Sequence, residues 1–246
     1  MTPLPPKNTP YRIVNRKMGR AIHRYDMISH GDRILVGISG GKDSLTLMWM
    51  LSERLRRVPV DYELIAVYID PGFEGGFGEQ LAAYCRQAGY RFRWERTDFG
   101  PRAHGPENRE NPCFLCSWNR RRRLFEIADE LDCSKVALGH HKDDIIETLF
   151  LNICYAGEIS TMKPVQPFFN GFLKVIRPLA LVEEQLIRQF ARHQHFPRFE
   201  NPCPSASAST RSEIKRLLGR LYESNAKIRG NIFRAIRHVN PDYLFR

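Results

Sequence analysis

The sequence has no hydrophobic run that approaches the roughly 20 residues a membrane-spanning helix needs. Its first residues, MTPLPPKNTPYR, are rich in proline and basic residues and lack the apolar segment of a secretory signal, so we expect a cytoplasmic protein. The chain also has no internal repeat. What is left is a globular protein of 246 residues, long enough to bury a substantial core.

Acidic residues are in deficit, and the deficit is confined to the two ends of the chain. The net charge is +11. Residues 1–33 contain seven basic and two acidic side chains, residues 211–246 contain nine and three, and the stretch between them is balanced. Basic ends on a neutral body are typical of proteins that bind a polyanion, although solvated helix faces would give the same counts. We therefore expect a nucleic acid partner.

Short apolar runs rich in β-branched residues alternate with helical patterns over most of the chain. The runs that read as strands are residues 33–38, 62–70, 91–98, 135–140 and 172–179. Strands that alternate with helices predict an α/β fold, here a parallel five-stranded Rossmann-like sheet with helical basic termini. Ligands of such sheets lie at the carboxyl ends of the strands.

Three segments follow from the charge distribution and the strand pattern. They are an N-terminal basic helical segment (1–32), a nucleotide-binding domain that carries the CxxC pair (33–200), and a third-cysteine loop with C-terminal basic helices (201–246). Residues 99–112 are rich in proline, glycine and asparagine and read as a loop that leads to the CxxC pair. A helix is expected only after it, over residues 119–132.

The stretch ISGGKDSL (38–45) resembles a phosphate-binding loop but fails the ATPase pattern. That pattern needs glycine where Val36 stands and serine or threonine where Asp43 stands. The dinucleotide pattern G-x-G-x-x-G is absent as well. The glycines nevertheless join a strand to a helix, where backbone N–H groups and the helix N-terminus favour an anion. We expect phosphate binding, with a plain strand–helix turn as the alternative; the added side-chain donors are Ser39, Lys42 and Ser44.

A second cluster, GHHKDD (139–144), also opens a helix after a strand. Asp143 and Asp144 fall in the first helical turn, where carboxylates either stabilise the helix itself or bind Mg²⁺ as hard oxygen ligands. His140 and His141 are candidates for contact with phosphate.

Three of the six cysteines have a distinctive setting. Cys113 and Cys116 form a CxxC pair, and both Cys113 and Cys203 sit in the tripeptide Asn-Pro-Cys. Proline restrains the backbone, so each thiolate is expected to be presented from a stiff loop. Three cysteines suit an iron–sulfur cluster with one open iron, a zinc site completed by a histidine, or catalytic persulfide chemistry. The histidines considered for the zinc site are His104, His193 and His195.

The other three cysteines read as small buried hydrophobes without a chemical role. Cys154 falls on the apolar side of the FLNIC segment, Cys85 lies within a helical pattern, and Cys133 precedes a strand.

These motifs together resemble a known family. SGGKDS after a buried strand is similar to the PP-loop of the N-type ATP pyrophosphatase superfamily. The order PP-loop, CxxC, GHHxDD and Pro-Cys before a basic helix resembles the tRNA 2-thiocytidine synthetase family (TtcA), from about residue 15 to the end. The resemblance implies an adenine nucleotide α-hydrolase-like sheet and thiolation of cytidine 32 of tRNA. It also implies ATP and Mg²⁺ as cofactors, AMP and pyrophosphate as products, and a cysteine desulfurase as sulfur donor.

The resemblance also assigns residues. It makes Lys42, Asp43, Asp143 and the three cysteines catalytic, with a 4Fe-4S cluster on Cys113, Cys116 and Cys203 and Mg²⁺ on Asp143 and Asp144. ATP is expected at Ser39, Gly40, Gly41, Lys42, Asp43, Ser44, Gly139, His140 and Arg120. RNA is expected at Arg121, Arg122, Lys215, Arg216 and Arg220. The sequence departs from many members at Ala206, where they have a further cysteine.

Two other readings stay open. One is a different PP-loop enzyme acting on tRNA, of the 2-thiouridine or lysidine type; an enzyme of the lysidine type needs no cysteine triad. The other is a non-catalytic RNA-binding protein with a structural metal. The apolar sides of the terminal helices would equally suit a homodimer interface.

Overall fold

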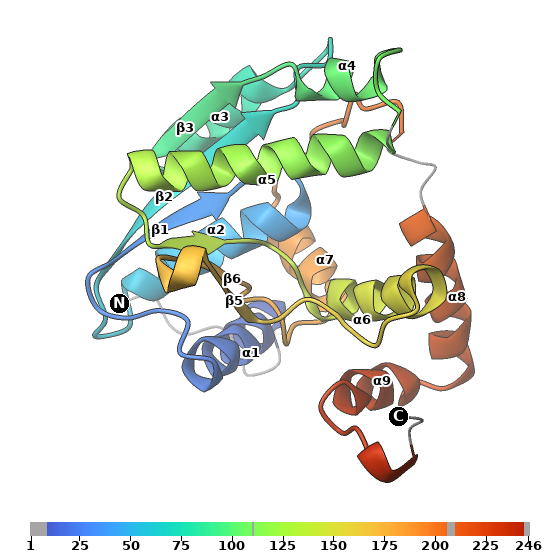
Figure 1. Ribbon diagram of the computed structural model, residues 1–246. Helices are drawn as coiled ribbons and strands as arrows, with labels where there is room; N and C mark the ends of the chain where they lie inside the picture. The colour runs from blue at the N-terminus through green and yellow to red at the C-terminus, as the bar shows by residue number, and fades with distance from the viewer. Residues whose placement is uncertain (1–8, 110, 206–209, 244–246) are drawn as a thin grey trace. The chain divides into compact units, whose positions relative to one another are not determined.

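The computed structural model describes residues 9–109, 111–205 and 210–243, and its centre is a six-stranded sheet (Figure 1). The strand order is β3-β2-β1-β4-β6-β5. The strands are β1 (Asp32–Gly37), β2 (Tyr62–Asp70), β3 (Phe92–Arg96), β4 (Lys135–Ala137), β5 (Val165–Phe168) and β6 (Leu173–Ile176).

Helices connect the strands and continue after the last of them. They are α1 (Pro10–Arg24), α2 (Lys42–Leu55), α3 (Gly78–Gln87), α4 (Phe99–His104), α5 (Pro112–Glu130), α6 (Lys142–Leu151), α7 (Glu184–His193), α8 (Thr210–Ser224) and α9 (Ile228–Ala235). Short helical turns lie at Asn152–Ala156, Phe169–Gly171 and Pro241–Tyr243. No helix among the described residues combines the length and apolarity that crossing a membrane requires.

The predicted α/β fold is confirmed, but the count of five strands is wrong. β1 pairs in parallel with β2 and β4, and the parallel pairing extends to β3 and β6. The strand that the sequence analysis missed, β5, pairs antiparallel with β6 at the edge of the sheet. It contains Pro167, which cannot donate to a ladder and is tolerated only at an edge, so its sequence does not read as a strand.

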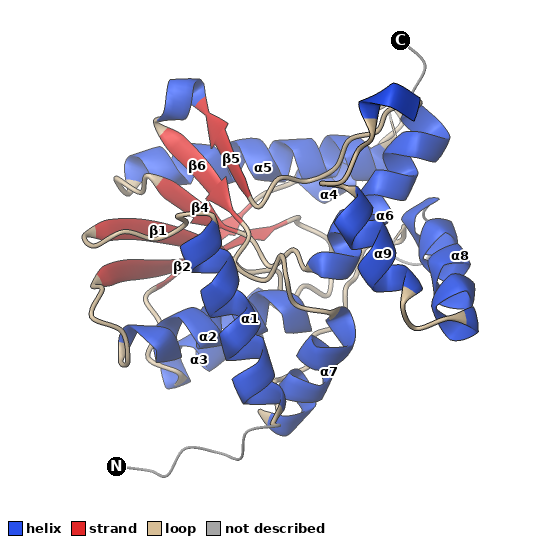
Figure 2. Ribbon diagram, turned by 90° about the horizontal axis from the view of Figure 1, so that it is seen from below, coloured by secondary structure: helices blue, strands red, loops and turns tan. Residues whose placement is uncertain are grey.

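The sheet has an apolar layer on each face, as its side-chain alternation requires. Helices cover both faces (Figure 2). Ile34 and Val36 of β1 point to the face covered by α1, α2, α3 and α7, whereas Leu35 points to the face covered by α5. The predicted N-terminal helix is confirmed, and its apolar side is part of the first layer: Tyr11, Val14, Met18, Ala21 and Ile22 are buried. Its basic residues therefore belong to a helix that is built into the domain core.

Two compact units divide the chain. The first runs to His141 and resumes at Lys163, so it contains the whole sheet together with Cys203. The second begins with α6 and resumes after Ala206 with α8 and α9; its core centres on Ile146, Ile214 and Leu218. The three-segment division expected from the sequence stays a prediction. Ala206 itself lies outside the described residues.

The expected loop over residues 99–112 is wrong at both ends. Residues 99–104 form α4, and α5 begins at Pro112, seven residues before its predicted start. Asn111 is the N-cap of α5: its side chain accepts hydrogen bonds from the backbone N–H groups of Cys113 and Phe114. Asn-Pro followed by an apolar turn is a helix start signal, because proline at the first helical position has no N–H to satisfy.

Candidate active site

The glycine loop lies where the strand order reverses. β1 is followed along the chain by its neighbour β2, whereas its other neighbour, β4, comes later, so β1 marks the switch point at which such sheets bind ligands. Three further polar segments end neighbouring strands at this same edge: Asp70 on β2, the segment 139–141 after β4, and Arg177 after β6. The sequence analysis placed the second of these, which opens the GHHKDD cluster, directly after a strand.

Gly40 is required by both the backbone and the packing of the loop. Its φ of +74° lies in the left-handed region, which costs other residues free energy. A Cβ there would approach Phe77 to 2.6 Å and Phe199 to 3.1 Å. These two rings stack at 5.0 Å, and Tyr68 stacks on Phe77 at 5.2 Å. The loop therefore rests on a wall of three aromatic rings.

Ser44 holds the loop in shape from inside. Its hydroxyl accepts a hydrogen bond from the backbone N–H of Ser39 at 3.1 Å and donates one to the Gly41 carbonyl at 3.0 Å. Ser44 is buried, whereas Ser39 and Gly41 are exposed. Ser44 is thus already engaged in forming the loop, and the exposed backbone around Gly41 is the part open to an anion.

Lys42 is held between two carboxylates. Its Nζ lies 3.0 Å from Asp43 Oδ2 and 3.1 Å from Glu184 Oε1 at the start of α7. Burial lowers the pKa of Lys42, but the two carboxylates outweigh burial and hold the pKa above its ordinary value. Lys42 is therefore a permanent cation beside the loop.

One carboxylate oxygen of Asp43 makes no hydrogen bond among the described residues. This oxygen, Oδ1, is buried and lies 3.6 Å from His141 Nε2. An orphaned buried carboxylate oxygen costs free energy unless a ligand satisfies it. A hard cation such as Mg²⁺ carried by a polyphosphate fits this atom.

The end of β4 touches the loop directly. A Cβ on Gly139 would lie 3.0 Å from the carbonyl carbon of Asp43 and 3.0 Å from the backbone nitrogen of Ser44. Only glycine allows this close approach of two backbones. The assignment of Gly139 to the loop's surroundings thus has a geometric reason.

Arg177 is the residue that the sequence analysis missed. It is 7% exposed, donates to His140 Nδ1 at 3.3 Å and to the Lys163 carbonyl at 2.6 Å, and has no carboxylate partner among the described residues. Burial, with a smaller contribution from Arg121, lowers its pKa from 12.5 to about 10. A buried cation without a counter-charge indicates an anionic ligand. The sequence pattern hid it, because VIRPL reads as the end of a strand.

A hollow of about 880 Å³ opens beside the glycine loop. Its walls carry four basic side chains against one acidic side chain, which suits a polyphosphate. The charged residues are Lys42, Arg188, Arg192, Arg198 and Asp43.

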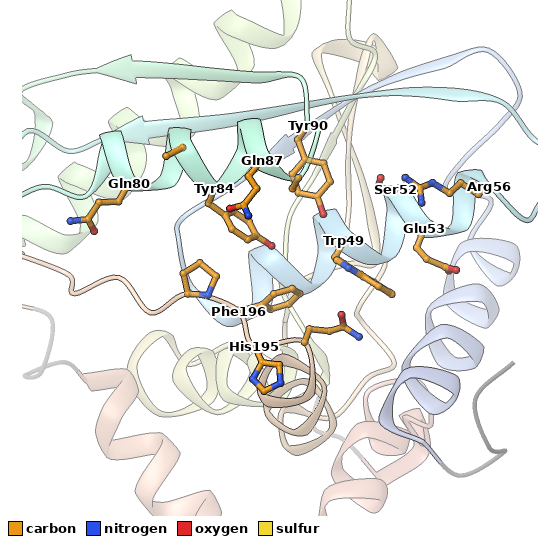
Figure 3. A pocket seen from close by; sticks show the side chains of 14 residues that line it. Trp49, Ser52, Glu53, Arg56, Gln80, Tyr84, Gln87, Tyr90, His195 and Phe196 are labelled. Atoms are coloured by element: carbon orange, nitrogen blue, oxygen red, sulfur yellow. The ribbon is translucent and has the colours of Figure 1, made fainter. Parts of the chain in front are cut away.

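A second hollow, of about 820 Å³, is shown in Figure 3. It shares His195, Phe196 and Pro197 with the hollow beside the glycine loop. Tyr84, Tyr90, Trp49 and Phe196 surround it, with side chains from α2 and α3. None of its lining residues belongs to the glycine loop or to the cysteine motifs. It is therefore not the candidate active site.

The two Asn-Pro-Cys tripeptides have the same local structure. The Asn111 side chain accepts from the Cys113 backbone N–H at 3.0 Å, and the Asn201 side chain accepts from the Cys203 backbone N–H at 3.1 Å. Cys113 and Cys116 lie three residues apart at the start of α5, so they are neighbours on the helix surface. The prediction that they lie in a loop is wrong. In each tripeptide the asparagine thus fixes the backbone of its cysteine.

Cys116, Cys113 and Cys203 are electrostatic neighbours. Burial raises the pKa of the Cys116 thiol, Arg120 lowers it, and charge on Cys203 or Cys113 raises it. Burial also raises the pKa of Tyr68, one of the three rings of the aromatic wall, and the charge of Arg120 opposes this rise. The Nε of Arg120 is buried without a hydrogen-bond partner. Arg120 is therefore close enough to both Cys116 and Tyr68 to perturb their pKa values, and its expected role in ATP binding stays a prediction.

The ligand group itself is not formed. In the part of the chain that the structure describes, no three His, Cys, Asp or Glu side chains lie close enough together to hold a metal ion. His104, a candidate for a zinc site, bonds through Nδ1 to the Gly100 carbonyl and through Nε2 to the Ser205 hydroxyl, so both ring nitrogens are engaged. The donor set of three thiols, two of them on one helical turn, still suits a cluster better than zinc.

In the second unit, the predicted magnesium ligands face arginines. Asp143 pairs with Arg229 at 3.0 Å, and Asp144 lies 3.5 Å from Arg211. The predicted RNA contacts of α8 are exposed, as are Arg121 and Arg122 of α5. The α8 residues in question are Lys215, Arg216 and Arg220.

Among the cysteines expected to be inert, one expectation is wrong. Cys85 and Cys133 are buried, but Cys154 is exposed; it lies in the π-helical turn Asn152–Ala156, which has no buried residue.

Residues 10–221 match the family model of the PP-loop domain. A tRNA-cytidine(32) 2-sulfurtransferase of Geobacter sulfurreducens is 39% identical over 96% of this chain and 93% of its own length. The enzyme of the same name from Syntrophotalea carbinolica is 40% identical over 95% and 92%. The structure of the U34-tRNA thiolase NcsA from Methanococcus maripaludis with its 4Fe-4S cluster superposes with a TM-score of 0.78, at 25% identity, over 94% of this chain and 80% of that one.

Proposed function

The chain belongs to the tRNA-cytidine(32) 2-sulfurtransferase family within the PP-loop domain proteins, and on that premise we propose that it replaces the C2 oxygen of cytidine 32 in tRNA by sulfur, with ATP as cosubstrate. The observation that carries the proposal lies within one compact unit. Arg120 links the surroundings of Cys116 to the aromatic wall behind the glycine loop. An adenylating loop and a sulfur-binding cysteine set on one scaffold are what the exchange of oxygen for sulfur needs.

The first half of the reaction forms a bond from the C2 oxygen of the base to the α-phosphorus of ATP and breaks the α–β bond. Backbone N–H groups around Gly41 and the cation of Lys42 stabilise the charge that develops on pyrophosphate. The free Oδ1 of Asp43 suits the Mg²⁺ of the nucleotide, and Asp143 and Asp144 are further candidates for it. We assign to Arg177 the binding of the α-phosphate, which remains bonded to the base.

In the second half, sulfur bonds to C2 and the oxygen leaves with AMP. Cys113, Cys116 and Cys203 would hold a 4Fe-4S cluster, whose iron without a protein ligand can carry the incoming sulfur. Asn111 and Asn201 fix the backbone of two of these cysteines, and the guanidinium of Arg120 opposes the effect of burial on the thiol of Cys116. We assign the supply of this sulfur to a cysteine desulfurase.

The test is made with the anaerobically reconstituted holoenzyme, tRNA that lacks thionucleosides, ATP and a sulfide source. We expect 2-thiocytidine in the nucleoside digest by mass spectrometry, and one AMP and one pyrophosphate for each base modified. Appearance of 2-thiouridine or lysidine would identify a different PP-loop activity, and tRNA binding without AMP release would identify a non-catalytic RNA-binding protein.

Gly139→Ala is expected to weaken ATP binding at least about ten-fold, because its Cβ pushes against the backbone of Asp43 and Ser44 and shifts the loop. Calorimetric titration with ATP measures the effect. Gly219→Ala is the matched control, since nothing lies within 4 Å of a Cβ there and alanine favours helix. Equal affinity of Gly139→Ala and the parent would contradict the role given to this contact.

A further inference from the structure

Within the CxxC motif and just after it, α5 exposes two large aromatic side chains. Phe114 is 60% exposed and Trp118 is 47% exposed, whereas large aromatic rings usually bury most of their surface. They follow one another at a spacing of four residues, and Arg122 continues the series, so the three share one face of the helix. We call these three side chains the α5 row.

The α5 row is cationic as well as aromatic. The Arg122 guanidinium lies 5.6 Å from the centre of the Trp118 ring and 3.1 Å from Glu126 at the far end of the row. Arg121 is exposed beside it, and among the described residues no carboxylate pairs with it. From Cys113 to Arg122 the helix contains no acidic residue at all. The charge of this surface therefore favours a polyanion.

Aromatic rings next to arginines are the chemistry by which proteins hold single-stranded nucleic acid. Unstacked bases lie on the rings, and arginine binds the phosphates between them. The row also starts inside the CxxC motif, since Phe114 lies between Cys113 and Cys116. A base stacked on Phe114 is therefore a neighbour of the cysteines.

We propose that Phe114 and Trp118 are a stacking platform for the unpaired nucleotides that flank the target base in the tRNA loop. Arg121 and Arg122 bind the phosphates of the same nucleotides. This inference rests on the proposed function, because it takes the loop that carries cytidine 32 as the RNA that reaches the cysteines. It adds two base-binding side chains to a set of RNA contacts that otherwise consists of cations.

The experiment measures binding of an anticodon stem–loop oligonucleotide to the holoenzyme. Trp118→Ala and Phe114→Ala are each expected to weaken binding about 30-fold, the middle of the range for loss of one stacked base. Alanine favours helix, so α5 stays formed, and ATP affinity and iron content stay as in the parent. Trp118→Phe restores most of the affinity. In the parent, binding quenches tryptophan fluorescence, and in Trp118→Phe the quenching is lost.

Ser117→Ala is the matched control, because Ser117 is exposed, lies between Phe114 and Trp118 in the sequence and contributes no ring. Oligonucleotides with an abasic site beside the target cytidine provide the second half of a double-mutant cycle. If base and ring touch, the parent should bind the abasic oligonucleotide more weakly than the intact one. Trp118→Ala should bind the two oligonucleotides with equal affinity.

Equal binding by the parent, Phe114→Ala and Trp118→Ala overturns the platform and leaves the proposed function standing. Faster cluster loss in air, with RNA affinity unchanged, would also overturn it and identify the rings as a shield. A parent protein that binds no stem–loop overturns both the platform and the proposed function.

Discussion

Cys113→Ser is expected to abolish tRNA thiolation and to leave the affinity for ATP unchanged. A serine hydroxyl is a poor ligand for iron, and removing one of three thiolates leaves the cluster with two. Removing a residue that only hydrogen-bonds to a metal ligand already lowers metal affinity or activity about 10–100-fold. Removing a ligand itself should therefore lower thiolation more than about 100-fold. The hollow beside the glycine loop has no cysteine in its lining, so ATP should bind as before.

Three measurements on the anaerobically prepared variant check this result: iron content, ATP affinity and 2-thiocytidine formed. Cys154→Ser is the matched control, because Cys154 is also exposed but belongs to neither Asn-Pro-Cys tripeptide. Cys116→Ser and Cys203→Ser should behave like Cys113→Ser. If Cys113→Ser kept both iron and thiolation, the cluster would have to be held by other residues. A parent that held zinc and no iron would leave the cluster without support.

Arg177→Met should lose most activity without losing stability. The low pKa of Arg177 means that the folded state disfavours its charged form at every pH below about 10. The fall from 12.5 to about 10 corresponds to about 3 kcal/mol. Its two hydrogen bonds return about 1 kcal/mol each. Methionine removes the buried charge and fills similar space, so the melting temperature should be equal or higher.

The activity of Arg177→Met should fall about 100-fold, by analogy with the loss of one preorganised donor in an anionic transition state. Arg177→Lys keeps a cation but not the planar fork, and should recover only part of the activity. The pH dependence has a definite sign. Because the folded-state pKa lies below 12.5, the destabilising charge is fully present below pH 10 and is relieved as pH rises through 10. Parent and variant should therefore converge in stability in alkaline solution.

A fall in melting temperature that matched the fall in activity would contradict this account. It would mean that Arg177 is mainly a structural bridge between His140 and the Lys163 carbonyl. The comparison separates the two roles because a purely structural arginine stabilises the fold, whereas an anion-binding one destabilises it until the anion arrives.

Local sequence signals predicted much of this protein correctly. The alternation of strands and helices, the glycine loop at the end of β1 and the burial of one side of α1 depend on periodicity and on residues adjacent in the chain. The helix that begins at Asn111 was missed although its signal was present. Asn-Pro was read as a stiff loop when it is an N-cap followed by proline at the first helical position.

Contacts between distant residues left no such signal. β5 carries a proline that only an edge position explains, and the edge is a property of the whole sheet. The unbalanced charge of Arg177 depends on β6 lying beside β4. The pairs of Asp143 with Arg229 and of Asp144 with Arg211 join residues more than sixty positions apart.

By itself the sequence determined the fold class, the position of the glycine loop and the two Asn-Pro-Cys tripeptides, because each of these is encoded by neighbours along the chain. The tertiary structure alone decided that Asp43 Oδ1 is buried without a hydrogen-bond partner and that Arg177 is buried without a carboxylate partner among the described residues. Burial is a sum over segments far apart in sequence, and it is burial that turns an ordinary charged side chain into one that needs a ligand.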